Sequence, residues 1–365
     1  QSLFEKGTIE KYARPCKGID TGDNGYFLRL WHEVALNKID DSRGEGDWVP
    51  YNKGGDFRRW FGNRDYVLRW NGSDEELSSR LKLTKKKPTL RNKDRWFKES
   101  FTWTSVTAST YSARYSPAGA MFDNGGSSIF SPNHLFVIGG LINSVVARRY
   151  FDVLSPSINY QPGEIGNLPY SGVLAETGSL IYEGIKDLVG SNIKISKYDW
   201  DSHETSWDFK ANELIALKNE VFLSINGEKQ SIPTLLTEIL EDYKSKWSRL
   251  FYQLHSNEEE LNRQFIEIYG LQDELTPEVP LEEITILQQG EISIENNEIV
   301  WHDDVIIKQL ISYAVGCWMG RYRLDKPGLH IAHPNPSSEE VCTYQYNGHD
   351  FEIDDDGIIP MMSCD

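Results

Sequence analysis

Positively charged and aromatic side chains alternate along two stretches in the first half of the sequence. The first holds Lys53, Arg58, Arg59, Trp60, Arg64, Arg69 and Trp70; the second holds Arg80, Lys82, Lys85, Lys86, Lys87, Arg91, Lys93, Arg95, Trp96 and Lys98. Lysine and arginine neutralise phosphates and release counterions, arginine makes bidentate contacts to guanine, and aromatic rings stack on exposed bases. The pattern therefore predicts contact with a nucleic acid, although a run such as Lys85 to Lys87 is equally typical of a solvated turn.

Base reading requires side chains that offer a hydrogen-bonding edge rather than charge alone. Asn24, Asn52, Asn63 and Asn124 are candidate adenine readers, but asparagine is also an ordinary turn residue. We assign the cations mainly to phosphate contact and give base reading to Arg114 or Asn124.

The sequence carries no recognisable catalytic motif. Phe122 to Gly126 has adjacent glycines where a cofactor loop alternates them, and Asn335 to Ser338 lacks the second proline and the aromatic residue of a base-holding turn. There is no P-loop, no H-E-x-x-H and no G-x-S-x-G. We therefore predict no catalytic residue and no bound cofactor in this chain.

Metal binding is not predicted either. The four cysteines, Cys16, Cys317, Cys342 and Cys364, show no C-x-x-C spacing, which disfavours a zinc site or a disulfide framework. His203 lies between Asp201 and Glu204 and invites a metal-ligand or general-base role. Because no second His or Cys stands nearby at ligand spacing, we expect a structural turn instead.

Charge is distributed unevenly along the chain. Residues 1–150 hold 24 Lys and Arg against 17 Asp and Glu, a net charge of +7, whereas the remainder holds 14 against 38, a net charge of −24. This asymmetry is expected when one module alone faces a polyanion. No membrane-spanning or signal segment is evident and no initiator Met is present, so we expect a cytoplasmic protein that forms part of a longer chain.

The elements predict an α+β fold. Short β-favouring runs at 66–68 and 101–104, separated by turn formers such as Asn71-Gly72, indicate a mixed-sheet domain with long loops over residues 1–170. After Ser131-Pro132 a buried helix is expected, with Gly139 and Gly140 permitting close packing.

A mostly helical, acidic domain is expected over residues 171–330. Helices at 238–254 and 257–269 would form an αα-hairpin, and another would begin at Asp303 or Asp304 and bury Val305, Leu310, Ala314 and Trp318. Residues 331–365 are predicted to form an acidic tail or a truncated element.

Several strings resemble one family of enzymes. Gly18-Ile19-Asp20-Thr21-Gly22-Asp23-Asn24-Gly25-Tyr26-Phe27 is similar to the element that opens the target-recognition region of gamma-type adenine DNA methyltransferases and of fused restriction-modification enzymes. Residues 27–34, 48–63, 141–144, 165–169, 200–209 and 257–262 resemble the PglX methyltransferases of BREX phage-defence systems. The WVPYNKGGDFRRWFGN string at 48–63 is specific, and the resemblance covers roughly residues 11–330.

The resemblance implies DNA target recognition for an adenine-N6 methyltransferase that uses S-adenosylmethionine in a catalytic domain not present in this chain. It implies double-stranded DNA and the missing N-terminal methyltransferase domain as partners, with other defence-system proteins as further candidates, and no membrane. The DNA-binding residues we predict are Thr21, Gly22, Asn24, Lys53, Arg58, Arg59, Arg64, Lys82, Lys85, Lys86, Lys87, Arg91, Lys93, Arg95, Arg114 and Asn124. Alternatives are a non-catalytic protein-interaction scaffold of the same defence system and an aromatic-rich carbohydrate enzyme with paired carboxylates.

Overall fold

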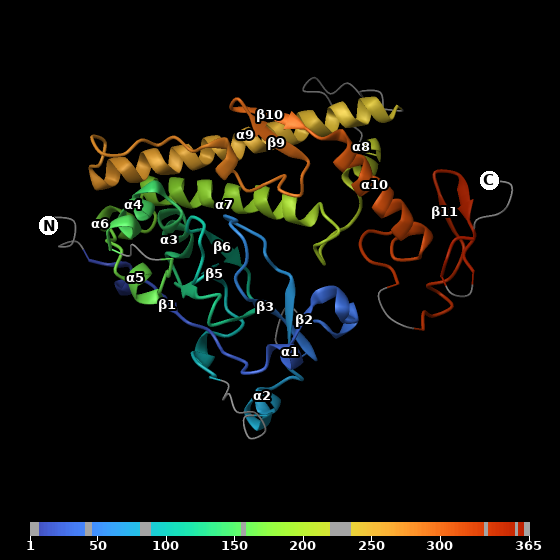
Figure 1. The fold of residues 1–365 in the computed structure, drawn as a ribbon, viewed down its shortest axis with the longest axis horizontal. Helices are drawn as coiled ribbons and strands as arrows, with labels where there is room; N and C mark the ends of the chain where they lie inside the picture. Colours follow the sequence, from blue (N-terminus) through green and yellow to red (C-terminus); the bar gives the residue numbers. More distant parts are fainter. Residues whose placement is uncertain are drawn as a thin grey trace. The chain divides into compact units, whose positions relative to one another are not determined.

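The computed structural model describes residues 7–40, 46–80, 89–154, 158–219, 235–331, 335–354 and 357–360. The fold is α+β, as predicted, with several small sheets and long helices (Figure 1). The chain divides into two compact units: the first comprises Gln1–Lys197 and Gln253–Thr285, and the second comprises Tyr198–Tyr252 and Ile286–Asp365. These units are interleaved along the sequence, unlike the consecutive domains with boundaries near residues 170 and 330 that the sequence suggested.

The first unit contains two four-stranded sheets. The antiparallel sheet has the order β1 (Arg14–Cys16), β8 (Ser128–Phe130), β5 (Ser100–Trp103), β6 (Ala113–Ser116). The mixed sheet has the order β2 (Leu28–Leu30), β4 (Tyr66–Arg69), β3 (Trp48–Asn52), β7 (Met121–Phe122), with β3 and β7 parallel. The strands predicted at 66–68 and 101–104 are therefore present as β4 and β5.

Apolar side chains of the mixed sheet form one core. Register places Leu68 of β4 between Leu28 of β2 and Val49 of β3, and all three side chains are buried in the same cluster as Met121. Alternation along each strand is what brings these residues to one face. At the end of β4 the chain turns through Asn71 and Gly72, which have φ values of 50° and 74°. Asparagine and glycine adopt this left-handed conformation more readily than other residues.

The helices of the first unit pack beside both sheets. Short helices are α1 (Asn24–Phe27), α2 (Glu75–Arg80), α5 (Pro162–Gly166) and α6 (Gly172–Ala175), and 3₁₀ turns lie at Ile9–Lys11, Trp31–Glu33, Leu36–Lys38, Lys93–Arg95 and Leu281–Glu283. The single helix expected after Ser131-Pro132 is two helices, α3 (Leu135–Ile142) and α4 (Val145–Leu154). The break falls at Asn143, whose side chain exchanges hydrogen bonds with the backbone of Ala113 on β6.

Gly139 gives α3 its close contact with the antiparallel sheet, as the sequence predicted. A Cβ atom at this position would lie 2.2 Å from the ring of Phe101 on β5. We therefore expect Gly139→Ala to lower the free energy of unfolding by about 1–3 kcal/mol, because the ring must move out of a packed core. Urea denaturation of the variant measures the change.

Gly184 supplies the matched control for this prediction. It lies in helix α7 (Leu180–Asp201), and a Cβ added there would meet nothing within 4 Å. Gly184→Ala should therefore stabilise the protein by about 0.5–1 kcal/mol, through the higher helix propensity of alanine. Equal effects of the two substitutions would contradict the packing argument for Gly139.

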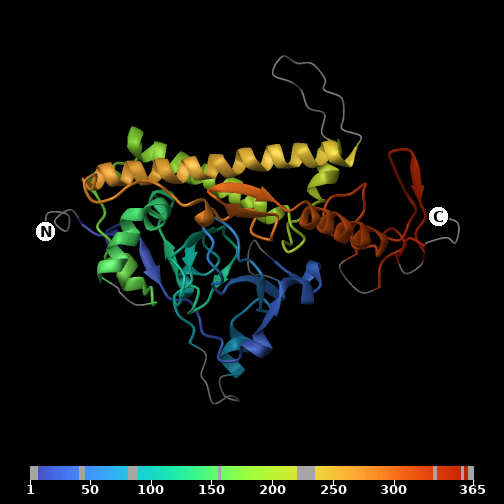
Figure 2. The same cartoon turned by 45° about the horizontal axis from the view of Figure 1, so that its top comes forward.

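The second long helix, α9, runs from Leu236 to Tyr269 without interruption (Figure 2). The sequence suggested two helices forming a hairpin, and this prediction is wrong. The segment between the two expected helices contains His255 and Ser256, and neither glycine nor proline is present to stop the helix there. A sequence that matches a capping box can continue as helix when nothing else ends the preceding one.

The second unit contains helices and two small hairpins. Helix α8 spans Glu213–Asn219, and strand β9 (Ile292–Glu295) pairs with β10 (Glu298–Trp301). Helix α10 (Asp303–Trp318) begins where the sequence predicted, but its buried residues are Ile306, Tyr313, Gly316 and Cys317 rather than the expected face. Trp318 of the expected face is 47% exposed because the helix packs Tyr313 and Cys317 against Phe209 and Tyr322 instead.

The region expected to form an acidic tail carries structure of its own. Strands β11 (Tyr344–Tyr346) and β12 (His349–Phe351) form a hairpin in which the Tyr344 and Phe351 rings stack with centroids 4.9 Å apart. The guanidinium of Arg323 lies 4.2 Å from the Tyr344 ring centroid, which attaches the hairpin to the preceding loop. Of the helices in the described ranges, none is long and apolar enough to cross a bilayer.

Candidate DNA-recognition surface

The Gly18 to Asn24 segment is one of four loops of the first unit that meet. On one side, the amides of Gly18 and Ile19 donate to the carbonyls of Asp123 and Phe122 at 3.2 and 2.9 Å. On the other side, Asp20 and Thr89 exchange two backbone hydrogen bonds of 3.1 and 2.8 Å. The Asp123 amide also donates to the Asn52 carbonyl at 2.8 Å. We call residues 17–24, 52–55, 89–95 and 123–126 the recognition loops.

Glycine is required where these loops touch. A Cβ on Gly18 would lie 1.9 Å from the carbonyl oxygen of Phe122, so no other residue fits without moving the backbone. Gly22 has a φ of 68°, and its amide donates to the Asp20 carboxylate at 2.9 Å. The two glycines thus allow the tight backbone course of this segment.

Thr21 and Asn24 form a fixed pair within the turn. Thr21 is only 1% exposed, and its hydroxyl donates to Oδ1 of Asn24 at 2.5 Å while accepting the amide of Asp23 at 3.3 Å. Asn24 itself is exposed and begins α1. The turn therefore presents Asn24 at the surface in an orientation set by a buried partner.

The loop from Asp123 to Gly126 is held by its own first residue. The Asp123 carboxylate accepts from the Tyr51 hydroxyl at 2.7 Å and from the Gly125 amide at 2.6 Å. Burial raises the pKa of Asp123, and burial together with this carboxylate raises the pKa of Tyr51. The hydroxyl thus stays protonated and acts as a donor, which keeps the loop rigid.

Three cations near these loops form no ion pair with a carboxylate among the described residues: Lys17, Lys53 and Arg91. Lys53 Nζ instead lies 4.7 Å from the Tyr66 ring centroid. The Asn92 side chain donates to the Lys17 carbonyl at 2.8 Å. This bond holds the segment that contains Arg91 beside Lys17. The sequence did not predict Lys17 as a DNA-binding residue, because a single lysine after a short strand has no distinguishing pattern.

Two predicted cations of the same stretch are already paired. Lys93 bonds to Asp74, and Arg95 lies 3.1 Å from the Asp94 carboxylate. Such partly exposed pairs contribute about 0–1 kcal/mol to stability. The predicted residues Lys82, Lys85, Lys86 and Lys87 lie outside the described residues.

Four predicted arginines lie in the interior instead of on this surface. Arg58, Arg59 and Arg64 are 6–8% exposed and Arg114 is 1% exposed. Arg58 donates to the Phe61 carbonyl at 2.7 Å, and burial lowers the pKa of Arg114 to about 10. The structure thus places these four guanidinium groups in the interior, which the sequence pattern did not indicate because it does not distinguish buried from exposed arginines.

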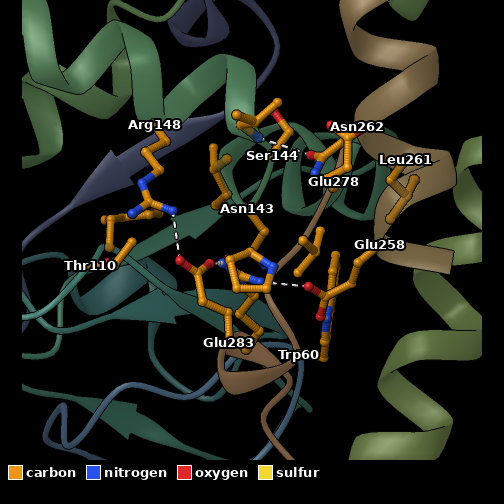
Figure 3. Close-up of a pocket in the computed structure, with 17 residues that line it drawn as sticks. Trp60, Thr110, Asn143, Ser144, Arg148, Glu258, Leu261, Asn262, Glu278 and Glu283 are labelled. Atoms are coloured by element: carbon orange, nitrogen blue, oxygen red, sulfur yellow. Dashed lines mark hydrogen bonds and ion pairs between the residues drawn. The ribbon is translucent and has the colours of Figure 1, made fainter. Parts of the chain in front are cut away.

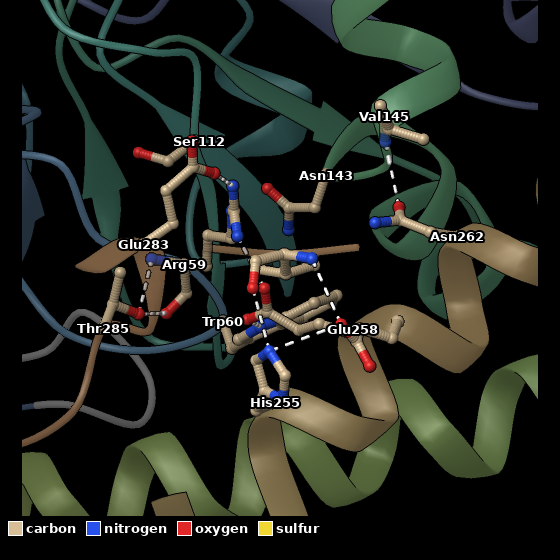
Figure 4. Close-up of polar contacts among 12 residues, drawn as sticks. Arg59, Trp60, Ser112, Asn143, Val145, His255, Glu258, Asn262, Glu283 and Thr285 are labelled. Carbon is tan, nitrogen blue, oxygen red and sulfur yellow. Dashed lines mark hydrogen bonds and ion pairs between the residues drawn. The ribbon is translucent and has the colours of Figure 1, made fainter. Parts of the chain in front are cut away.

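Arg59 is the centre of a buried ion network (Figure 4). Its guanidinium is 2.5 Å from Glu258 of α9 and 2.5 Å from Glu283, and its backbone amide donates to Thr285 Oγ at 3.1 Å. The indole of Trp60 donates to the other Glu258 oxygen at 2.6 Å. Burial opposes ionisation of Glu283, but Arg59 and Arg148 outweigh it and lower its pKa. The network attaches the loop of residues 58–63 (RRWFGN) to α9.

A cavity of about 50 Å³ borders this network (Figure 3). Asn143, Asn262 and Trp60 line it together with Glu258 and Glu283. This volume accommodates one or two water molecules, since each occupies about 30 Å³ in the liquid. This is well below the roughly 300 Å³ of a typical small-molecule site.

The asparagines proposed as adenine readers are mostly engaged. Asn52 is buried and donates to Ser116 at 2.8 Å, and Asn63 donates to the Asp56 carbonyl at 2.9 Å. Asn124 is half-buried, and its Oδ1 is buried without a hydrogen-bond partner. Bidentate reading of adenine needs both the oxygen and the nitrogen of a free amide. Of the four, Asn24 alone combines an exposed position with a fixed orientation.

His203 is part of a buried cluster in the second unit. Its Nδ1 lies 2.7 Å from the Asp199 carbonyl and its Nε2 lies 2.6 Å from Glu291, whose carboxylate also accepts from Gln309 at 2.7 Å. Burial disfavours the imidazolium, but Glu291 and Asp199 outweigh it and raise the pKa of His203. Within the described ranges no three His, Cys, Asp or Glu side chains gather as a metal site. The geometry agrees with a structural role for His203.

Comparison with known proteins identifies the family. No family model matches the chain. The chain is 33% identical over 359 residues to the adenine-specific methyltransferase BrxX of Escherichia coli O9:H4 (strain HS), covering 96% of the chain and 27% of the relative. It is 34% identical over 354 residues to the adenine-specific methyltransferase PglX of Lacticaseibacillus casei (strain Zhang), covering 93% of the chain and 27% of the relative.

The similarity extends over nearly the whole chain, which is therefore homologous to a segment of the adenine-specific methyltransferases BrxX and PglX of the BREX type. The chain spans only 27% of the length of each of these relatives. The predicted resemblance is thus confirmed, whereas the role of this segment is a separate question.

Proposed function

We propose that this chain provides DNA target recognition for an adenine-specific methyltransferase of a phage-defence system. The recognition loops would face double-stranded DNA, and methyl transfer from S-adenosylmethionine to the adenine N6 atom would occur in a catalytic domain outside this chain. The observation that carries the proposal is the convergence of the Thr21–Asn24 turn with Lys17, Lys53 and Arg91 on neighbouring loops.

Loops fixed on a rigid scaffold suit target recognition. Positions on loops can vary in sequence while the sheet beneath holds them in place. Here each loop is tied to its neighbour by backbone hydrogen bonds, and Asp123 holds its own loop through Tyr51. Phosphate contacts by the nearby cations would orient the duplex, and side chains between them would reach the bases.

Binding to a mixed-sequence DNA duplex at several salt concentrations tests the proposal. We expect the affinity to fall steeply between about 50 and 200 mM salt. The slope of the logarithm of the binding constant against the logarithm of the salt concentration reflects the number of phosphates that the protein neutralises. The triple variant Lys17→Ala, Lys53→Ala, Arg91→Ala should bind more weakly. Its slope should be shallower by about one unit for each phosphate that is no longer neutralised.

A second triple variant serves as the control. Lys11, Lys186 and Lys194 are exposed cations of the same unit that lie outside the recognition loops, so replacing them by alanine changes the net charge equally. This variant should keep most of the affinity and the slope. Equal losses of affinity in the two triple variants would point to general attraction and reject the loops as the interface. Salt-independent binding by the unaltered chain would reject the proposed function itself.

A further inference from the structure

Helix α10 of the second unit (Figure 1) carries apolar side chains on two opposite faces. One face, which contains Tyr313 and Cys317, is buried within this unit. The side chains of the opposite face are between 45% and 59% exposed and belong to Ile311, Val315, Trp318 and Met319. They recur at spacings of three and four positions, so they form one continuous stripe along the helix. We call these four residues the exposed α10 stripe.

An exposed stripe of this kind indicates a surface that a partner covers. A surface helix is normally apolar on one face, whereas a helix that is apolar all round is normally buried. Single exposed apolar residues are common, but contiguous ones mark interaction sites. Tryptophan is enriched among the residues that contribute most to binding energy, and Trp318 lies within the stripe. We therefore expect the second face of α10 to be covered by a partner.

The unit that carries the stripe is strongly acidic. Residues 198–252 and 286–365 hold 24 Asp and Glu against 10 Lys and Arg, a net charge of −14. Lys308 is the one cation in the sequence of α10, and its ammonium is paired with Asp304 at 2.9 Å. The helix therefore adds no uncompensated positive charge to this surface.

The chain that follows α10 brings further carboxylates to the end of the stripe. Residues 319–360 hold eight Asp and Glu against three Lys and Arg, a net charge of −5. This segment returns to the helix, because the Ile359 amide donates to the Trp318 carbonyl at 2.9 Å. Glu352 precedes this contact, is exposed, and forms no ion pair with any described residue. A partner that approaches this end of α10 therefore meets negative charge.

This charge decides among the possible occupants. DNA, an anionic membrane surface and a second copy of this chain, whose net charge is −17, would all be repelled. A helix with Lys and Arg beside an apolar face would be attracted, and apolar side chains at i, i+4 and i+7 match the spacing of the stripe. We propose that the exposed α10 stripe is the docking site for a basic amphipathic helix of another protein. The inference concerns the second unit and does not depend on DNA recognition by the first.

A model peptide tests this inference on the whole chain. The probe is a fluorescein-labelled peptide of about 18 residues, roughly five helical turns, in which leucines form one face and lysines flank them. Its binding is followed by fluorescence anisotropy. A second peptide with glutamate in place of every lysine should bind at least about tenfold more weakly, because the charge beside the stripe repels it.

The double variant Ile311→Ala, Val315→Ala shortens the apolar side chains at the centre of the stripe. We expect it to bind the lysine peptide about tenfold more weakly than the unaltered chain, because less apolar surface is buried. Alanine favours helix and both side chains are exposed, so the thermal unfolding midpoint should be unchanged. The control Val153→Ala, Ile158→Ala shortens the same two side-chain types at exposed positions of the first unit and should bind like the unaltered chain.

Met319→Lys is a second variant, placed just after the last turn of α10 at a side chain that is 59% exposed. The added positive charge should weaken binding of the lysine peptide and strengthen binding of the glutamate peptide. Equal binding of the two peptides by the unaltered chain, or equal losses in the stripe and control variants, would overturn the inference. So would a dimer of the unaltered chain in analytical ultracentrifugation that the stripe variant abolishes, because a second copy would then occupy the surface.

Discussion

Glu258→Ala is expected to lower the free energy of unfolding by about 3–5 kcal/mol, which is the usual cost of leaving a buried charge without its partner. Glu258 is 4% exposed and accepts from both Arg59 and the Trp60 indole. Its removal would leave the Arg59 guanidinium with Glu283 alone and the indole without an acceptor. Chemical denaturation followed by tryptophan fluorescence measures the decrease.

Glu260→Ala is the matched control on the same helix. Glu260 pairs with Arg263 one turn away, and the two side chains are 38% and 57% exposed, so this pair contributes about 0–1 kcal/mol. A loss of stability at Glu258 no larger than that at Glu260 would refute the importance of the buried network. Arg59→Ala should also destabilise the protein strongly, and a double-mutant cycle of Arg59 with Glu258 then isolates their interaction energy.

The local features of the first unit could be predicted from the sequence. Strands β4 and β5, the Asn71-Gly72 turn and the close packing of Gly139 all follow from a few neighbouring residues. Such features depend on side-chain alternation, on turn residues with positive φ and on side-chain size. The family resemblance was likewise carried by short contiguous strings.

Features that depend on distant residues could not be predicted. Arg59 and Glu258 are separated by 199 positions, and nothing near Arg59 indicates that its guanidinium will be buried. The sequence pattern therefore assigned Arg58, Arg59, Arg64 and Arg114 to DNA, although all four are buried in the structure. Conversely, Lys17 becomes a candidate only when Asn92 is seen to bond to its carbonyl.

Ion pairing also reduces how much positive charge of residues 1–150 is available to a ligand. The net charge of +7 over residues 1–150 includes the buried Arg59, whose carboxylate partners come from later in the sequence, and exposed cations such as Lys93 that have local partners. The positive charge available to a duplex is therefore smaller and more localised than the count suggests. Under the proposed function, such a localised charge would orient the duplex through its phosphates.

The second large effect is expected from the buried pair of His203 and Glu291. These side chains are 5% and 0% exposed, and both ring nitrogens of His203 face acceptors. The protonated ring can therefore donate one hydrogen bond to each of them. His203→Gln keeps a donor but removes the charge opposite Glu291. We expect it to destabilise the protein by about 3–5 kcal/mol near pH 6.

The pH dependence of stability distinguishes this pair from ordinary packing. The pKa of His203 is raised above its usual 6.5, so its contribution is fully present below about pH 6.5 and is lost as pH rises through the folded value. The pKa of Glu291 is lowered from its usual 4.5 because His203 outweighs the effect of burial. Its contribution is fully present above about pH 4.5 and is lost as pH falls through the folded value.

Unfolding free energies of the unaltered protein, His203→Gln and a His349→Gln control should be measured across this range. His349 is exposed on β12, so its replacement should leave the pH profile unchanged. The decline in stability above about pH 6.5 should flatten in His203→Gln, because the group that releases a proton there is gone. If the unaltered protein and His203→Gln lose stability in parallel as the pH rises, His203 is neutral in the folded state, and the attraction to Glu291 is not what holds this part of the second unit together.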